Sequence, residues 1–277
     1  MAENVYKKID IKVMDSFIEK FARKYIEQRS RTNANLSPLS KSQLFKDIGF
    51  DTSLLEGIIA KNSVARDFKR ESGETPLVLR DIYRSDLGEL LMTYYFEEKL
   101  DDESRFIIPL KNITYRERED MPGRGMDAIG YRVSENKIEI LLGEAKVSAQ
   151  KKNPPDVVDI TNDSIYKTQK KYIDNLDMVI RRLTDYFKRL DSKDAEIIGL
   201  AIVCMENKKP EDYSITFGCT LIRDFTCVDT KKDFGKMKTN QEEFDPNKIH
   251  FPILSFTEKN IEQTAQKFYE KVQELIK

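Results

Sequence analysis

Apolar residues recur along this chain with two spacings, every third or fourth residue in some segments and every second residue in others. The first spacing predicts amphipathic helices, and the second predicts strands with one buried face. The expected helices span residues 13–28, 42–48, 53–59, 79–100, 164–190 and 258–276. The expected strands span residues 105–110, 126–133, 137–147, 196–205, 215–222 and 249–256, of which 196–205 is apolar on both faces. Polar stretches at 32–41 and 71–76 predict a loop and a break.

The order of these elements indicates the fold class. From residue 79, a helix is followed by three strands, a second helix and a further strand. This order predicts an α/β protein with a mixed central sheet. We expect an N-terminal helical lobe over residues 1–76 and a second domain over residues 77–277, with its core at 79–205 and a C-terminal strand–helix extension. Asn162 or Asp163 would cap the long helix at 164–190.

Composition narrows the chemistry further. The 47 lysines and arginines nearly balance 48 acids and give a net charge of −1, so a nucleic-acid-binding surface would have to be a local patch. A single histidine, His250, excludes zinc sites built on several imidazoles. It would also have to serve any Ser-His-Asp site, for which the chain has no Gly-x-Ser-x-Gly turn. Catalysis would therefore depend on carboxylates, lysines or a hard metal ion.

Other absent patterns concern cofactors and location. The three cysteines, Cys204, Cys219 and Cys227, have no metal-binding spacing and suit reduced thiols. The chain has no Gly-x-x-x-x-Gly-Lys-Ser/Thr loop for a nucleotide. The longest apolar stretch, residues 197–205, is too short to span a bilayer, and residues 1–10 lack the apolar core of a signal peptide. We expect a cytoplasmic protein without a membrane partner, in which the histidine and the cysteines are structural.

The most informative segment is the pair of expected strands at 126–133 and 137–147. Side chains alternate between the two faces of a strand, so Glu144 and Lys146 point to the same side as the apolar Leu142. A tight turn between the strands would bring Ile129 opposite Leu142, and the same register places Asp127 opposite Glu144. Side chains that face each other in this way have Cβ atoms about 4.5–5.5 Å apart.

Two carboxylates at that distance repel each other, so one takes up a proton unless a cation lies between them. Mg²⁺ is the natural occupant, with Mn²⁺ as a substitute, because it takes carboxylate oxygens and keeps several waters. Such an ion activates water and holds a phosphate oxygen. Lys146 would orient or deprotonate the attacking water, or stabilise developing negative charge. These parts suit phosphodiester hydrolysis, although a Glu-x-Lys pair without Asp127 would be an ordinary feature of a charged strand.

Asp127 and the sequence Glu144-Ala-Lys146, in this order of elements, resemble the PD-(D/E)XK nuclease superfamily. The resemblance covers residues 79–205 and implies the αβββαβ core of the restriction endonucleases. It also implies that Asp127 and Glu144 bind Mg²⁺ and that Lys146 is the catalytic lysine. Met126 stands where the superfamily has proline. Glu89, on the preceding helix, lies where some members have an additional metal-binding glutamate, and it would equally suit a surface position.

A narrower resemblance rests on three short motifs. They are Arg84-Ser-Asp-Leu-Gly-Glu89, Gly125-Met-Asp-Ala-Ile-Gly130 and Leu142-Gly-Glu-Ala-Lys146. These motifs are similar to those of the HamA family, the nuclease subunits of the Hachiman anti-phage defence system. This resemblance implies a superfamily 2 helicase as partner, which holds the nuclease inactive and releases it on sensing foreign or damaged DNA.

Positive charge gathers after the expected catalytic strand. Residues 146–193 contain eleven lysines and arginines against seven aspartates. The lysines nearest to that strand are candidates for contacts with the phosphates of DNA: Lys151, Lys152, Lys167, Lys170 and Lys171. A solvated helix face with offsetting aspartates would explain the same pattern.

The main prediction is a Mg²⁺-dependent endonuclease or DNase that acts in defence with a regulatory partner. One alternative is a stand-alone restriction-type endonuclease that reads sequence with its N-terminal helices. The other is a non-catalytic DNA-binding or assembly subunit that keeps only the fold, against which the complete acid–acid–lysine set argues. The substrate could be DNA or RNA.

Overall fold

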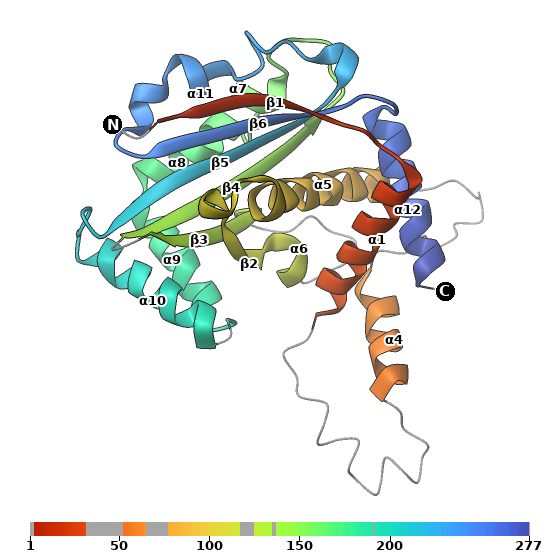
Figure 1. Ribbon diagram of the computed structural model, residues 1–277, viewed down its shortest axis with the longest axis horizontal. Helices are drawn as coiled ribbons and strands as arrows, with labels where there is room; N and C mark the ends of the chain where they lie inside the picture. Colours follow the sequence, from red (N-terminus) through yellow and green to blue (C-terminus); the bar gives the residue numbers. More distant parts are fainter. Residues whose placement is uncertain are drawn as a thin grey trace, which may run out of the picture. The chain divides into compact units, whose positions relative to one another are not determined.

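Six strands form one mixed sheet within the described part of the chain. The computed structural model describes residues 3–31, 52–64, 77–116, 125–134, 137–190 and 192–276. The strands follow one another across the sheet in the order β1-β6-β5-β4-β3-β2 (Figure 1). They are β1 (Val5–Ile11), β2 (Ile107–Lys111), β3 (Ala128–Ser134), β4 (Lys137–Ser148), β5 (Tyr213–Asp224) and β6 (Lys248–Phe256).

The direction and register of the strands match most of the sequence-based expectations. Strands β1, β6, β5 and β4 run parallel to one another, whereas β3 is antiparallel to both β4 and β2. The strands predicted at 105–110, 126–133, 137–147, 215–222 and 249–256 are confirmed. Ile129 lies opposite Leu142, as predicted. The turn between β3 and β4, at residues 135–136, lies outside the described residues.

The helices also follow the predicted pattern in most places. Helices are confirmed at 13–28, 53–59, 79–100 and 258–276, whereas the segments 32–41, 42–48 and 71–76 lie outside the described residues. No described helix has the length and apolar character needed to cross a membrane. The α-helices are α1 (Asp15–Ser30), α4 (Thr52–Ser63), α5 (Leu77–Tyr94), α6 (Asn112–Tyr115), α7 (Asp156–Asp159), α8 (Ile165–Asp174), α9 (Leu176–Phe187), α10 (Ser192–Glu206), α11 (Gly235–Thr239) and α12 (Ile261–Leu275).

The strand predicted at 196–205 is wrong, because this segment lies within helix α10. A short apolar run does not by itself distinguish a buried strand from a buried helix. The helix buries Ile198 and Ala201 completely, while Leu200 and Val203 on its other side are more than half exposed. The strand that follows the helical segment is therefore β5, which begins at Tyr213.

Three further expectations need correction. The helix predicted over 164–190 is broken at Asn175 into α8 and α9, and the Asn175 side chain accepts a hydrogen bond from the Met178 N–H at 3.1 Å. Ser164, rather than Asn162 or Asp163, occupies the N-cap position of α8. The N-terminal segment is not entirely helical either, because β1 pairs in parallel with β6.

Contacts divide the chain into two units. The first consists of residues 1–13, 88–112 and 125–261 and contains the whole sheet. The second consists of residues 14–87, 113–124 and 262–277. Both units take segments from either side of residue 76, and the expected division of the chain there stays a prediction.

Aromatic rings and one buried ion pair hold the second unit together. Tyr25 of α1, Tyr83 of α5 and Phe268 of α12 contact one another with ring centroids 5.5–5.8 Å apart. Asp86, in the first of the three HamA-like motifs, forms a fully buried salt bridge with Arg116. Asp86 therefore stabilises this unit.

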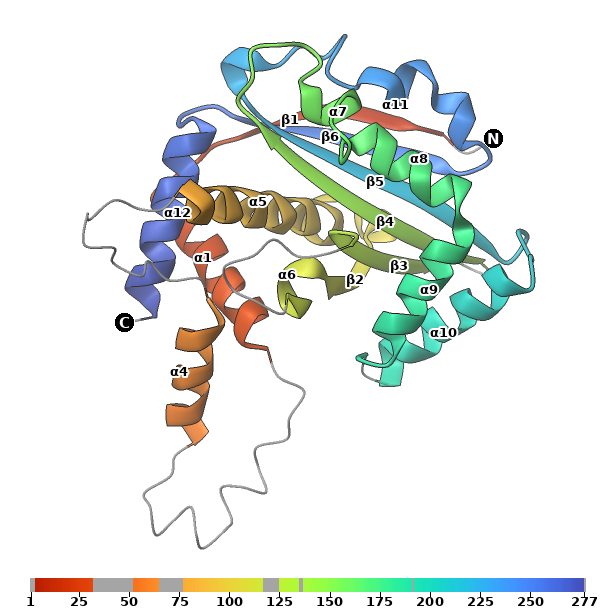
Figure 2. The same cartoon turned by 180° about the vertical axis from the view of Figure 1, so that it is seen from behind.

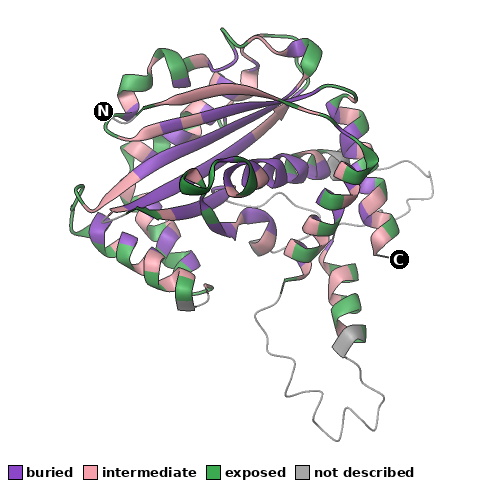
Figure 3. Ribbon diagram, in the orientation of Figure 1, coloured by how far each residue is buried: buried purple, intermediate pink, exposed green. Residues whose placement is uncertain are grey.

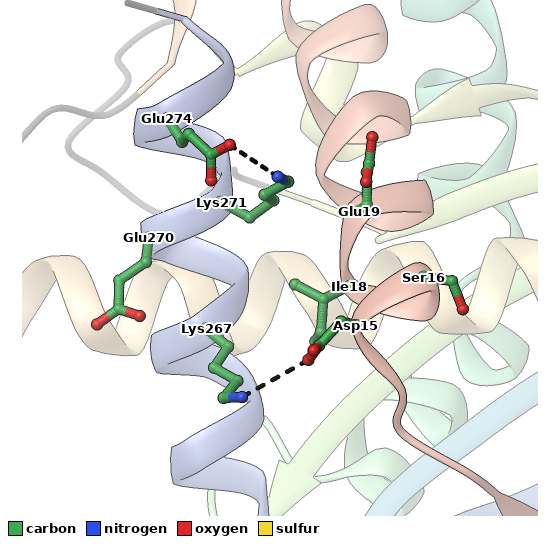
Figure 4. A pocket seen from close by; sticks show the side chains of 8 residues that line it. All are labelled: Asp15, Ser16, Ile18, Glu19, Lys267, Glu270, Lys271 and Glu274. Atoms are coloured by element: carbon green, nitrogen blue, oxygen red, sulfur yellow. Dashed lines mark hydrogen bonds and ion pairs between the residues drawn. The ribbon is translucent and has the colours of Figure 1, made fainter.

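A groove of about 490 Å³ lies between α1 and α12 of the second unit (Figure 4). Lys267 crosses it toward Asp15 at 3.6 Å, and Lys271 pairs with Glu274 at 2.8 Å. The charged residues of the groove are Asp15, Glu19, Lys267, Glu270, Lys271 and Glu274. Because carboxylates outnumber lysines, the groove would repel nucleic-acid phosphates.

The side chains of β4 point alternately to the two faces of the sheet in the first unit, and different helices cover these two faces. Its even-numbered side chains, among them Glu144 and Lys146, point to the face on which α7 and α8 lie (Figure 2). The odd-numbered side chains face the C-terminal half of α5. That helix approaches so closely that a Cβ at Gly88 would lie 2.6 Å from Val147 Cγ2. Figure 3 shows that β4 and β5 are buried along most of their length.

The single histidine lies on β6, and the three cysteines are buried and unoxidised. His250 Nε2 lies 2.7 Å from the Tyr95 hydroxyl. Burial, followed by the charges of Lys7 and Arg132, lowers the pKa of His250 to about 4. The imidazole is therefore neutral at physiological pH and contributes to the fold in that form.

This lowered pKa predicts an acid-sensitive component of stability. Because the unfolded chain takes up the proton near the ordinary pKa of 6.5, the contribution of His250 is complete above pH 6.5. It is lost as the pH falls toward 4, and it amounts to about 2–3 kcal/mol. Chemical unfolding between pH 4 and 7 should show a weaker pH dependence in His250→Gln than in the wild type. Parallel curves for the two proteins would contradict the prediction.

Candidate active site

The candidate site begins where β3 enters the sheet. The β3–β4 ladder ends at the pair Ala128 and Gly143, so Asp127 lies one residue beyond it. The Asp127 carboxylate oxygen Oδ2 accepts a hydrogen bond from the Ala145 N–H at 2.7 Å, which holds the side chain against the backbone of β4 just beyond the β3–β4 ladder. Gly125, two residues earlier, has a φ of +111°, which favours glycine.

Glu144 and Lys146 lie on one face of β4, as the alternation predicted. The Lys146 ammonium donates to Glu144 Oε1 at 3.0 Å and to Asp163 Oδ2 at 3.1 Å. The Glu144 side chain is only 5% exposed and that of Asp163 is 77% exposed. Lys146 therefore bridges a buried carboxylate and a solvent-facing one.

The charges in this cluster perturb one another. Burial, and next the charge of Asp127, raises the pKa of Glu144 well above its ordinary value, although Lys146 acts in the opposite direction. Burial alone would lower the pKa of Lys146, but Glu144, Asp127 and Asp163 outweigh it and raise that pKa. Lys146 is therefore an ammonium beside a carboxyl group that resists ionisation. Both effects place Asp127 and Glu144 within electrostatic reach of each other.

Sequence reasoning missed three polar residues near the carboxylates. The sequence indicates Asp163 only as a helix cap. Tyr172 is buried, and after burial the charges of Glu144 and Asp127 are the main causes that raise its pKa. Arg182 on α9 opposes that rise. No local pattern marks these residues, because they reach the site only through the packing of α8 and α9.

Arg182 lies beside the segment that leads into Asp127. A Cβ at Gly125 would lie 3.4 Å from the Arg182 Cζ, so the glycine leaves room for the guanidinium group. Arg182 is partly buried and has no hydrogen bond or ion pair to any residue that the structure describes. A partly buried cation of this kind is suited to an anionic ligand.

The donor set suits a hard divalent ion that keeps most of its water. Among the described residues, no group of three or more His, Cys, Asp or Glu side chains forms an all-protein metal cage. Mg²⁺ commonly binds through one or two carboxylates together with waters and substrate phosphates. Asp127 and Glu144 provide such a pair, and after burial the charge of Asp127 is the main cause that raises the pKa of Glu144.

Glu89 is 3% exposed on α5, so the surface alternative does not hold for it. Its role as an additional metal ligand stays a prediction. The five lysines proposed to contact DNA also stay predictions, but three of them have intramolecular partners. Lys152 pairs with Asp156, Lys167 donates to the Ile160 carbonyl, and Lys170 pairs with Asp174. Lys151 and Lys171 have no ion pair to a described residue.

Comparison with known proteins identifies the family. A family model described as HamA matches residues 14–273 of the 277. Searches of curated proteins and of solved structures give no match. The family match contains Asp127, Glu144 and Lys146, together with all three motifs described above. The chain therefore belongs to the HamA family and is a component of the Hachiman anti-phage defence system.

Proposed function

We propose that this protein is a Mg²⁺-dependent DNase, the effector nuclease of its defence system. One observation carries the proposal: burial and the charge of Asp127 together raise the pKa of Glu144 on β4, and the Lys146 ammonium lies 3.0 Å from Glu144. Buried carboxylates with perturbed pKa values beside a cation are typical of catalytic sites.

The order of elements supports the PD-(D/E)XK core as the framework of this site. Helix α5 is followed by strands β2, β3 and β4, then by the helical segment α7–α10, and then by β5. This is the αβββαβ order that the resemblance implied, with β5 in place of the strand expected at 196–205. Glu89 on α5 is the candidate for an additional ligand.

The residues of the site would divide the work of phosphodiester hydrolysis. Asp127 and Glu144 would hold Mg²⁺, which when bound supplies a water of lowered pKa and neutralises phosphate charge. Lys146, as an ammonium, would orient the attacking water and stabilise the negative charge that develops on the phosphate. Arg182 would bind a phosphate of the substrate and so position the scissile bond.

The proposal includes a regulatory partner and a cellular location. An uncontrolled DNase would damage the DNA of its own cell, so a restraining subunit is needed. The family resemblance points to a superfamily 2 helicase that holds the nuclease inactive and releases it on suitable DNA. We propose that the pair acts in the cytoplasm.

One experiment tests the proposal against its alternatives. Purified chain is incubated with linear and circular DNA, with and without Mg²⁺ and a candidate superfamily 2 helicase, in parallel with Glu144→Ala and Lys146→Ala. Mg²⁺-dependent degradation that both substitutions abolish supports the proposal. Discrete site-specific fragments would instead show a restriction-type enzyme. No cutting under any of these conditions would show an inert subunit and overturn the proposal.

Arg182→Ala should raise the apparent KM for DNA by about tenfold with little change in kcat, because one phosphate contact is lost. The salt dependence of binding should also weaken by about one phosphate contact. Cleavage rates over a range of DNA and salt concentrations measure both effects. Arg181→Ala is the matched control, since Arg181 is the exposed neighbour on the same helix. Equal effects of the two substitutions would contradict this role for Arg182.

A further inference from the structure

A second polar cavity lies on the opposite face of the sheet from Glu144. Its volume is about 320 Å³, and it is built from β1, β3, β4, β5 and β6 together with the segment that follows α5. Glu139 of β4 lines it, five residues before Glu144 and with its side chain on the other face. At about 3.3 Å per residue, the two carboxylates are about 16 Å apart along the strand. The cavity is therefore separate from the candidate active site.

Cationic side chains outnumber the acidic ones in this cavity, and its one buried acid is already paired. Four cationic side chains line it: Lys7, Lys99, Arg132 and Lys248. The buried acid, Glu139, is already engaged, since Arg132 donates to its Oε2 at 2.5 and 2.8 Å and Thr216 donates to its Oε1. The other two acids, Glu3 and Asp101, are exposed. Arg132 and Glu139 thus neutralise each other within the wall, and Lys248 lies 3.6 Å from the same carboxylate.

Lys7 and Lys99 have no carboxylate partner among the described residues. Their ammonium groups lie instead over aromatic rings, Lys7 at 5.2 Å from the centroid of Tyr95 and Lys99 at 5.3 Å from that of Tyr94. A ring stabilises a cation but leaves its N–H groups able to donate to an anion. His250, also in the wall, experiences this positive field, because Lys7 and Arg132 both contribute to its lowered pKa.

We propose that this cavity binds a small phosphate-bearing anion, held by Lys7 and Lys99 with Lys248 beside them. Its volume lies at the lower end of the range for ligand sites, which suits pyrophosphate or a mononucleotide rather than a polymer. The side chains that provide this site line one cavity, and Arg132 is fixed by Glu139 and by its contact with the Phe106 ring at 5.0 Å. The inference does not depend on the proposed nuclease activity.

The single histidine provides a direct test. Tag-free protein with ¹³C-labelled histidine gives one imidazole signal, from His250. This signal is followed over pH while inorganic phosphate, pyrophosphate or adenosine monophosphate is added at constant ionic strength in chloride. We expect a saturable upward shift of the His250 pKa, because a bound anion offsets the field of the lysines. The tightest of the three compounds identifies whether a free phosphate or a nucleotide is the better ligand.

Neighbouring lysines of β1 provide matched variants. Lys7→Ala should weaken binding by about tenfold, and Lys99→Ala should do the same, because each removes a charge-assisted hydrogen bond. Lys8→Ala makes the same change in net charge but removes a side chain on the other face, where Lys8 pairs with Asp10 at 2.7 Å. It should bind like the wild type, and so should Glu144→Gln.

The opposite results would overturn the inference. One is a response of His250 that does not saturate for any of the three anions, or that equals the response to chloride alone. The other is equal weakening by Lys7→Ala and Lys8→Ala, which would indicate a general charge effect. Thermal unfolding of each variant confirms that a lost response comes from a folded protein.

Discussion

Replacing Glu144 with glutamine is expected to reduce Mg²⁺-dependent DNA cleavage by at least about 10³-fold and to make the metal-free protein more stable. The loss of activity follows from the loss of a proposed metal ligand. The gain in stability follows from the raised pKa of Glu144, because a buried group that resists ionisation costs free energy at neutral pH. We expect a gain of about 1–2 kcal/mol near pH 7.

The sign of this effect depends on pH. Because the pKa of Glu144 is higher in the folded than in the unfolded state, its destabilising effect appears as the pH rises above the ordinary value of 4.5. The advantage of Glu144→Gln should therefore shrink as the pH falls toward 4.5. Thermal unfolding in EDTA measures it, and added Mg²⁺ should raise the melting temperature of the wild type but not of the variant. A variant less stable than the wild type at every pH would contradict this account.

Glu139→Gln is the matched control on the same strand. Burial alone would raise the pKa of Glu139, but hydrogen bonds from Thr216 and Arg132 outweigh burial and lower it. Neutralising Glu139 should therefore destabilise the fold by about 1–3 kcal/mol, opposite in sign to the change at Glu144. The folded fraction of this variant should cut DNA at the wild-type rate.

Lys146→Met is expected to reduce cleavage by about 10²–10³-fold while Mg²⁺ binding persists. Methionine keeps the length of the side chain and removes the ammonium that would stabilise negative charge on the phosphate. The two proposed metal ligands are left in place. Single-turnover cleavage rates measure the catalytic loss, and a titration with Mn²⁺ followed by electron paramagnetic resonance measures metal binding.

Asp163→Asn tests whether the ion pair between Asp163 and Lys146 is needed for cleavage. Asp163 is the exposed partner of the ammonium, so its replacement should leave cleavage within several-fold of the wild type. If Lys146→Met cut DNA as well as the wild type, the lysine would be only a structural counter-charge for Glu144. If Lys146→Met lost both cleavage and Mn²⁺ binding, the loss of cleavage would be attributed to the missing metal ion rather than to the missing ammonium group.

The hairpin that carries the candidate site could be predicted because strand alternation fixes the face of each side chain. A slip of one residue between β3 and β4 would turn the buried side chains to the wrong face, so the apolar pattern determines the register. This register placed Ile129 opposite Leu142, whereas the ladder ends at Ala128 and Gly143, one pair short of the expected pairing of Asp127 with Glu144. The choice of the two carboxylates and the lysine as site residues followed from that local rule and stays a prediction.

The remainder of the site could not be predicted because it depends on tertiary packing. Asp163 and Tyr172 come near the carboxylates through the loop before α8 and through α8, and Arg182 of α9 lies beside Gly125 and near Tyr172. Helix α10 could not be predicted for the same reason. Its apolar run also fits a buried strand, and its packing against α9 stabilises the helical conformation. The charged cavity escaped notice because its lysines come from distant segments of the chain.

The parallel pairing of β1 with β6 has a consequence for synthesis. Val5 leaves the ribosome 245 residues before its strand neighbour His250. At bacterial translation rates the interval is on the order of 10–50 s. During this time β4 can already pair with β3 next to it, whereas the edge formed by β1 stays open and the wall containing Lys7 is incomplete. Strand β1 is therefore the first strand of the sheet to be synthesised, and it acquires its neighbour last.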